Sequence, residues 1–161
     1  MKDQFAGFLT VFEALDRQEV EYILIGGVAV ILHGLERLTR DIDIFVRPTL
    51  ENIAKLRAAL KTVFNDPAID EISLPELQRY AVIRFGAPGH FYVDLMARLG
   101  EAVVYEDLQY EVMEQEGIKI RVASPETLYR LKHDTLRDKD KADAHFLRKL
   151  IESRSSGQQL L

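Results

Sequence analysis

The stretch GGVAVILHGLERLTRDIDIFV, residues 26–46, combines features that a buried segment rarely has. Gly26 and Gly27 end one apolar run, and Asp41 and Asp43 occupy alternate positions of the next. Successive side chains of a β-strand point to opposite faces, so the two aspartates share one face and the apolar residues between them share the other. The stretch therefore predicts a strand, a glycine turn, a short helix and a second strand that carries two neighbouring carboxylates.

The paired carboxylates indicate a cation site. Two carboxylates side by side repel each other, and both are driven toward protonation unless a cation lies between them. Oxygen ligands of this kind suit Mg²⁺ or Mn²⁺. Taken alone, an Asp-x-Asp pair is more typical of a solvent-facing edge strand than of a metal site. The preceding glycines favour the functional interpretation, because a strand end that opens a helix leaves backbone N–H groups unpaired and lets a phosphate approach. A phosphate site beside a metal site is the arrangement of metal-assisted phosphoryl or nucleotidyl transfer.

Composition sets the class of protein. The chain has 161 residues, of which 47% are hydrophobic, so it is long enough to bury a core of its own. We expect a single domain over residues 1–152 and a flexible polar tail over residues 153–161. The net charge of −5 argues against bulk attraction to nucleic acid, although one basic groove would suffice for local binding.

The same composition excludes several kinds of site. The chain has no cysteine, so it forms neither a disulfide nor a thiolate zinc site. No apolar run approaches the roughly 20 residues of a membrane span, and no cleavage site follows the N-terminus. We therefore expect a soluble cytoplasmic protein with no membrane contact.

Hydrophobic periodicity predicts a sheet covered by helices. Residues 65–79 have no clear pattern. We assign the fold class α/β (α+β), with a mixed β-sheet packed by helices and a long C-terminal helix. Helices are expected over residues 3–18, 28–34, 49–64 and 124–152, and strands over residues 21–27, 41–46, 118–122 and, as a hairpin or two neighbouring strands, 81–96.

The opening stretch also resembles a known signature. A glycine pair followed about a dozen residues later by D-h-[DE]-h, where h is apolar, is similar to the DNA polymerase beta-type nucleotidyltransferase superfamily. The fuller pattern GGxAxxxHGxxRxTxDID resembles its small bacterial and archaeal members, including the AbiEii-type toxin-like transferases. This resemblance covers about residues 22–47. The segment LYRLKHDTLRDKDKADAHFL, residues 128–147, also resembles the lysine-bearing C-terminal helix of those proteins.

The resemblance implies a third carboxylate on a neighbouring strand. Asp94 in FYVDLM fits this position, although it is also compatible with an ordinary edge-strand aspartate. In the family's arrangement Asp41 and Asp43 would bridge two metal ions. Asp94 would bind the metal that activates the attacking hydroxyl, and attack on the α-phosphate would release pyrophosphate.

Further candidates concern the phosphates. Arg37 and Thr39 match the motif and are candidates to assist Gly26 and Gly27 in nucleotide binding, but a structural role explains them equally well. Helical geometry places Lys132 in one stripe with Lys139 and Asp143. An inward-facing charge cluster of this kind is unfavourable unless it is paired or binds a ligand. Lys132 is therefore either a phosphate contact, which the resemblance favours, or one partner of an ion pair with Asp143 or Asp140.

Together these patterns predict an enzyme. We expect a Mg²⁺- or Mn²⁺-dependent nucleotidyltransferase that moves a nucleoside monophosphate from a nucleoside triphosphate such as ATP to a hydroxyl acceptor. The acceptor is left open among RNA, protein and a small molecule. Two alternatives remain: a toxin-like transferase that acts on RNA or protein and is restrained by an antitoxin partner, and a catalytically silent nucleotide-binding module.

Overall fold

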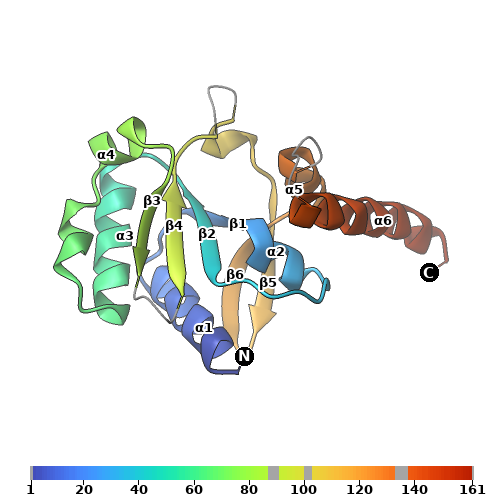
Figure 1. Ribbon diagram of the computed structural model, residues 1–161, viewed down its shortest axis with the longest axis horizontal. Coiled ribbons are helices and arrows are strands. Elements are labelled where there is room, and N and C mark those ends of the chain that lie inside the picture. The colour runs from blue at the N-terminus through green and yellow to red at the C-terminus, as the bar shows by residue number, and fades with distance from the viewer. Residues whose placement is uncertain (1, 87–90, 100–102, 133–137, 161) are drawn as a thin grey trace.

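The computed structural model describes residues 2–86, 91–99, 103–132 and 138–160. Within these ranges the chain forms a six-stranded mixed sheet (Figure 1). The pairs β1–β6 and β2–β4 are parallel, and the remaining neighbours are antiparallel. In spatial order the strands are β3 (Ile83–Gly86), β4 (Tyr92–Met96), β2 (Asp41–Val46), β1 (Tyr22–Ile25), β6 (Ile118–Ala123) and β5 (Tyr110–Gln115).

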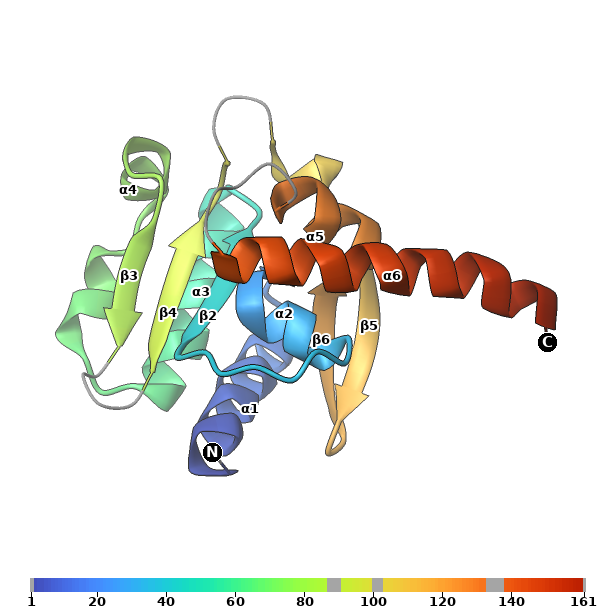
Figure 2. The ribbon, with the colours of Figure 1, turned by 45° about the vertical axis from the view of Figure 1, so that its right-hand side comes forward.

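Helices cover both faces of the sheet. On one face α1 (Lys2–Arg17) packs against α3 (Leu50–Val63) and β6. On the other face α2 (Gly26–Leu32) contacts β1 and β2 and also meets α5 (Pro125–Lys132) and α6 (Asp138–Leu160). In Figure 2, α2 and α6 cross in front of the strands while α1 and α3 lie behind them.

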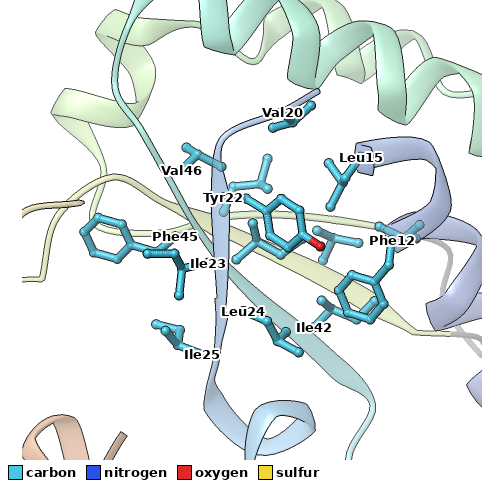
Figure 3. Packing of buried hydrophobic residues seen from close by; sticks show 14 of the residues in the cluster. Phe12, Leu15, Val20, Tyr22, Ile23, Leu24, Ile25, Ile42, Phe45 and Val46 are labelled. Atoms are coloured by element: carbon cyan, nitrogen blue, oxygen red, sulfur yellow. The ribbon is translucent and has the colours of Figure 1, made fainter. Parts of the chain in front are cut away.

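Strand β1 is buried on both sides because it lies between these two helix layers. Tyr22 and Leu24 point toward Phe12 and Leu15 of α1, whereas Ile23 points to the opposite side (Figure 3). All five side chains are at most 2% exposed. This two-sided burial explains why β1 is apolar at every position, as expected for a central strand that helices cover on both faces.

The predicted fold class is confirmed. Thr49 caps α3 by accepting a hydrogen bond from the backbone N–H of Asn52, so the helix begins where it was expected within residues 49–64. Strands β3 and β4 form the antiparallel pair expected within residues 81–96. The glycine turn does open a short helix, α2.

The expectation of one continuous helix over residues 124–152 is wrong. Two helices, α5 and α6, occupy this region and pack against each other, which one straight helix cannot do. The second helix extends to Leu160, beyond the predicted boundary at residue 152. The single-domain assignment itself stays a prediction.

Four further elements of the described ranges lie outside the predicted set. The unpatterned residues 65–79 contain a 3₁₀ turn, η1 (Pro67–Glu71), and a short helix, α4 (Leu74–Arg79). A second 3₁₀ turn, η2 (Tyr105–Asp107), precedes the unpredicted strand β5. Across the ranges that the structure describes, no helix is both long and apolar enough to span a membrane.

Candidate active site

Asp41, Asp43 and Asp94 lie on one face of two neighbouring strands. Parallel pairing of β2 with β4 places Asp43 directly beside Asp94, and residues opposite each other in register project to the same face. Asp41 lies two positions earlier on β2 and shares this face. The alternate β2 residues Ile42 and Ile44 are fully buried in the core on the other side. Alternation along β2 therefore separates an apolar face from a carboxylate face.

The glycine turn makes room for the central carboxylate. Gly26 has a φ of +75°, in the left-handed region that favours glycine. A Cβ atom at this position would lie 2.1 Å from Oδ2 of Asp43. Ile25, the last residue of β1, pairs with Asp43 of β2, so the glycine that follows it lies beside the carboxylate. Gly26 is thus required both for the turn and for the position of Asp43.

The environment of Asp43 disfavours its charged form. Burial, together with the charges of Asp94 and Asp41, raises the pKa of Asp43 to about 7, and the positive charge of Lys132 offsets only part of this effect. Near neutral pH the ionised carboxylate therefore lacks sufficient positive charge around it. A bound cation would supply that charge.

Arg84 on β3 contacts this carboxylate cluster and was missed at the sequence level. Its Nε and Nη2 atoms donate to the two carboxylate oxygens of Asp94 at 2.8 and 3.0 Å. Nη2 also lies 3.3 Å from Oδ2 of Asp41. The guanidinium stacks over the ring of Tyr92, 4.7 Å from its centroid. The available signal was the antiparallel hairpin, whose register places Arg84 opposite Asp94.

The three carboxylates fit a divalent metal by their chemistry, since they are adjacent oxygen ligands with too little positive charge around them. In their present positions, however, no group of three His, Cys, Asp or Glu side chains within the described ranges is arranged to hold a metal ion. Arg84 supplies the positive charge to Asp94 and Asp41 instead.

A second group of predicted residues surrounds Gly27. A Cβ atom at Gly27 would lie 2.9 Å from Nη2 of Arg37 and 3.3 Å from Oγ1 of Thr39. The backbone N–H of Asp41 donates to the same Thr39 oxygen at 3.4 Å. Arg37 reaches across this turn to pair with Asp143 of α6. Gly27 therefore leaves space for the two side chains that lead into β2.

Lys132 forms the ion pair that the sequence left as an alternative. Its Nζ lies 2.9 Å from Oδ1 of Asp140 and 3.0 Å from Oδ2 of Asp143. Both aspartates are at most 1% exposed. Oδ1 of Asp143 has no hydrogen-bond partner among the described atoms. The side chain of Lys139, predicted in the same stripe, lies outside the described structure.

All eight predicted site residues line one cavity of about 300 Å³. They are Gly26, Gly27, Arg37, Thr39, Asp41, Asp43, Asp94 and Lys132. Arg84 and Asp140 line it as well, and the apolar side chains include Leu128 and Leu131 of α5. Two other cavities of similar volume contain none of the eight predicted residues. The structure thus brings the predicted residues together in a single place.

The mixed sheet, the glycine turn and the carboxylate strands form a nucleotidyltransferase fold of the polymerase beta type. The model of the family described as "Nucleotidyl transferase AbiEii toxin, Type IV TA system" matches residues 10–148. The chain belongs to this AbiEii family. A search of curated proteins finds none that matches the sequence.

Solved structures share the fold at low sequence identity. Lincosamide antibiotic adenylyltransferase LnuA, solved with lincomycin bound, is 18% identical with a TM-score of 0.54, over 89% of this chain and 95% of that one. ANT(2'')-Ia in complex with adenylyl-2''-tobramycin is 14% identical with a TM-score of 0.57, over 96% and 92%. An antigenic nucleotidyltransferase-like protein from Paracoccidioides brasiliensis is 17% identical with a TM-score of 0.54, over 88% and 76%. At these identities the likeness shows the fold alone.

Proposed function

We propose that this protein transfers a nucleoside monophosphate from a nucleoside triphosphate to a hydroxyl acceptor, using Mg²⁺ or Mn²⁺ held by Asp41, Asp43 and Asp94. The observation that carries the proposal is the convergence of these three carboxylates beside the Gly26–Gly27 turn in one cavity. A catalytically silent nucleotide-binding module has no need of three adjacent carboxylates that repel one another.

The reaction is a substitution at the α-phosphorus. The acceptor hydroxyl oxygen forms a bond to that phosphorus, the bond to the oxygen bridging the β-phosphate breaks, and pyrophosphate leaves. A bound divalent ion would neutralise the charge that develops on the phosphate oxygens and lower the pKa of the hydroxyl. Asp41 and Asp43 would hold a metal ion at the α-phosphate. Asp94 would help to hold the ion that lowers the pKa of the acceptor hydroxyl, and would accept the proton that the hydroxyl loses.

The residues around Gly27 and Lys132 are proposed to bind the remaining phosphates. The ammonium of Lys132 has three N–H donors, of which its contacts with Asp140 and Asp143 account for two. Within the part of the chain that the structure describes, the third has no partner, and we propose that it binds a phosphate oxygen. The guanidinium of Arg37 has five donors, and one of its nitrogens contacts Asp143. Both side chains line the cavity, so a triphosphate placed there would meet two positive charges.

The family suggests a biological setting and leaves the acceptor open. The family description names a toxin of a type IV toxin–antitoxin system, and we therefore propose a toxin that an antitoxin protein restrains in the cytoplasm. The two antibiotic-related neighbours are described by adenylyl chemistry, which makes ATP the first donor to test. RNA, protein and small-molecule hydroxyls are the acceptors to compare.

The test is transfer of label from each α-³²P-labelled triphosphate in the presence of Mg²⁺. Purified protein is mixed with separated RNA, protein and small-molecule fractions of a cell lysate, and the labelled product is identified. Wild type should label one fraction, and Asp43→Asn should not. Glu114→Gln, a neutralising change on the exposed edge strand β5, is the matched control and should label as wild type does.

Two outcomes would contradict the proposal. Absence of labelling with all four donors in every fraction, while ATP binds, would indicate the silent module. Labelling that persists in Asp43→Asn would place the chemistry elsewhere. Growth arrest on expression that Asp43→Asn relieves would support the toxin assignment.

A further inference from the structure

Arg84 occupies a distinctive position between two cavities. It lines the cavity of the carboxylates and also a neighbouring cavity of about 310 Å³ between β3, η1 and α4. Glu71 and Glu76 contribute acidic side chains to this second cavity, with Tyr80 beside them. The Arg84 side chain is 52% exposed, whereas its main partner Asp94 is only 8% exposed. An exposed cation therefore pairs with a buried anion from the solvent side.

We infer that Arg84 is a built-in counter-ion that divalent metal must displace from Asp94 and Asp41. The inference rests on the proposed function, because it concerns the same carboxylates. The guanidinium uses both oxygens of Asp94 and approaches Oδ2 of Asp41. A divalent cation brought to these oxygens would meet the guanidinium at contact distance. Two like charges so close repel strongly, so the guanidinium and the metal ion exclude each other.

The surroundings of Arg84 allow such an exchange. Strand β3 is at the edge of the sheet, with β4 as its single neighbour. The guanidinium lies over the ring of Tyr92, and this cation–π contact attracts the charge without requiring one orientation of the guanidinium. In the second cavity Glu71 and Glu76 offer the displaced charge an acidic environment. The exchange thus moves Arg84 from one set of carboxylates toward another and does not leave its charge without a partner.

Mn²⁺ binding to the metal-free protein measures the exchange directly. The loss of the electron paramagnetic resonance signal of free Mn²⁺ gives the dissociation constant without any catalytic turnover. Arg84→Ala should bind Mn²⁺ about tenfold more tightly than wild type, since both a competing charge and a bidentate contact are removed. Arg84→Lys should fall between the two, because lysine keeps the charge but cannot make the bidentate contact.

Arg17→Ala is the matched control. It also removes one positive charge, but Arg17 is 75% exposed on α1 and pairs with Glu13 on the far side of the sheet. Its Mn²⁺ affinity should stay within about twofold of wild type, because exposed charges beyond a Debye length of roughly 10 Å are screened. If Arg17→Ala and Arg84→Ala raise the Mn²⁺ affinity equally, the change in net charge alone explains the effect and the inference is overturned. Unchanged or weaker binding in Arg84→Ala would overturn it too.

The neighbouring cavity provides a second test. Glu71→Gln combined with Glu76→Gln should weaken Mn²⁺ binding when Arg84 is present, because the displaced guanidinium loses its acidic environment. The same pair of changes in an Arg84→Ala background should have a smaller effect, which a double-mutant cycle measures. An equal effect in both backgrounds would show that the two glutamates do not receive Arg84, and would refute that part of the inference.

Thermal stability separates this inference from the proposed function. Without metal, Arg84→Ala should melt below wild type because Asp94 loses its partner, and saturating Mn²⁺ should remove the difference. Mn²⁺ binding that is insensitive to Asp43→Asn would contradict the metal site of the proposed function. Binding that Asp43→Asn abolishes but Arg84→Ala leaves unchanged would contradict the Arg84 exchange alone.

Discussion

Replacing Asp43 by asparagine should stabilise the metal-free protein at pH 8 and leave its stability nearly unchanged at pH 4. The asparagine has the same shape but no charge, so it removes the repulsion with Asp94 and Asp41. The pKa of Asp43 is about 7 in the folded protein, against 3.8 for an ordinary aspartate. Between these values the folded state binds more protons than the unfolded state. The free energy of unfolding of wild type therefore falls as the pH rises through this window.

The magnitude follows from the same pKa difference. The pKa of Asp43 differs by about 3 units between the folded and unfolded states. At about 1.4 kcal/mol per unit, ionised Asp43 lowers the free energy of unfolding by at most about 4 kcal/mol. Asp43 remains partly exposed, and solvent screens part of the repulsion. We therefore expect Asp43→Asn to gain about 2 kcal/mol at pH 8.

Urea unfolding in the presence of EDTA, at pH 4 and at pH 8, measures this difference. Glu114→Gln serves as the control, since it removes a charge from an exposed position of β5 and should change stability by less than about 0.5 kcal/mol at either pH. Adding Mg²⁺ at pH 8 should reverse the order of the two proteins, because only wild type keeps the full set of metal ligands. An Asp43→Asn protein that is no more stable than wild type at pH 8 without metal would refute the reasoning.

Two further changes test the phosphate side of the site. Gly27→Val places the two methyl groups of valine against Arg37 and Thr39, so its affinity for a non-hydrolysable triphosphate, measured by calorimetry, should fall about tenfold. If the variant melts earlier but binds the triphosphate normally, Gly27 is needed for the turn only. Lys132→Ala should weaken triphosphate binding more than monophosphate binding, and should also cost about 3 kcal/mol of stability in urea because it leaves Asp140 and Asp143 without their lysine partner. Equal weakening of both nucleotides would restrict the lysine to its ion pair.

Local patterns predicted most strands of the sheet, including the edge strand β3, but missed the other edge strand, β5. Strand β5 alternates between exposed and partly buried positions, with Val112 60% exposed, so its hydrophobic period is weak. The turn after it was the missed signal. Glu116 and Gly117 have φ values of +50° and +80°, the two-residue turn that joins antiparallel strands, and an E-G pair before IKIRV is compatible with it.

The separation of α5 from α6 could not be predicted from local sequence. The chain between Lys132 and Asp138 contains neither glycine nor proline, and the amphipathic pattern continues through it. What favours two helices is tertiary: α5 packs on α2 and on α6, and both Asp140 and Asp143 of α6 reach back to Lys132. Such contacts depend on the path of the whole chain, which helical periodicity does not report.

The candidate site likewise contains residues that local patterns predict and one residue that only tertiary structure places. Asp41, Asp43 and the two glycines follow from strand alternation and spacing within one short stretch, and those rules are local. Arg84 lies on another strand, and its pairing with Asp94 depends on the register of a hairpin. Residue spacing alone did not fix that register.

The position of Arg84 also explains why Asp43 is the residue on which the pH prediction depends. Among the residues that the structure describes, Arg84 contacts the carboxylates of Asp94 and Asp41 and not that of Asp43. The carboxylate of Asp43 lies against Gly26, on the side of the site where β1 ends. The guanidinium therefore compensates the charges of Asp94 and Asp41 and leaves the charge of Asp43 beside two other carboxylates. A divalent ion held by these side chains would also offset the charge of Asp43. Metal should therefore replace Arg84 most readily above the pKa of Asp43, where that charge is complete.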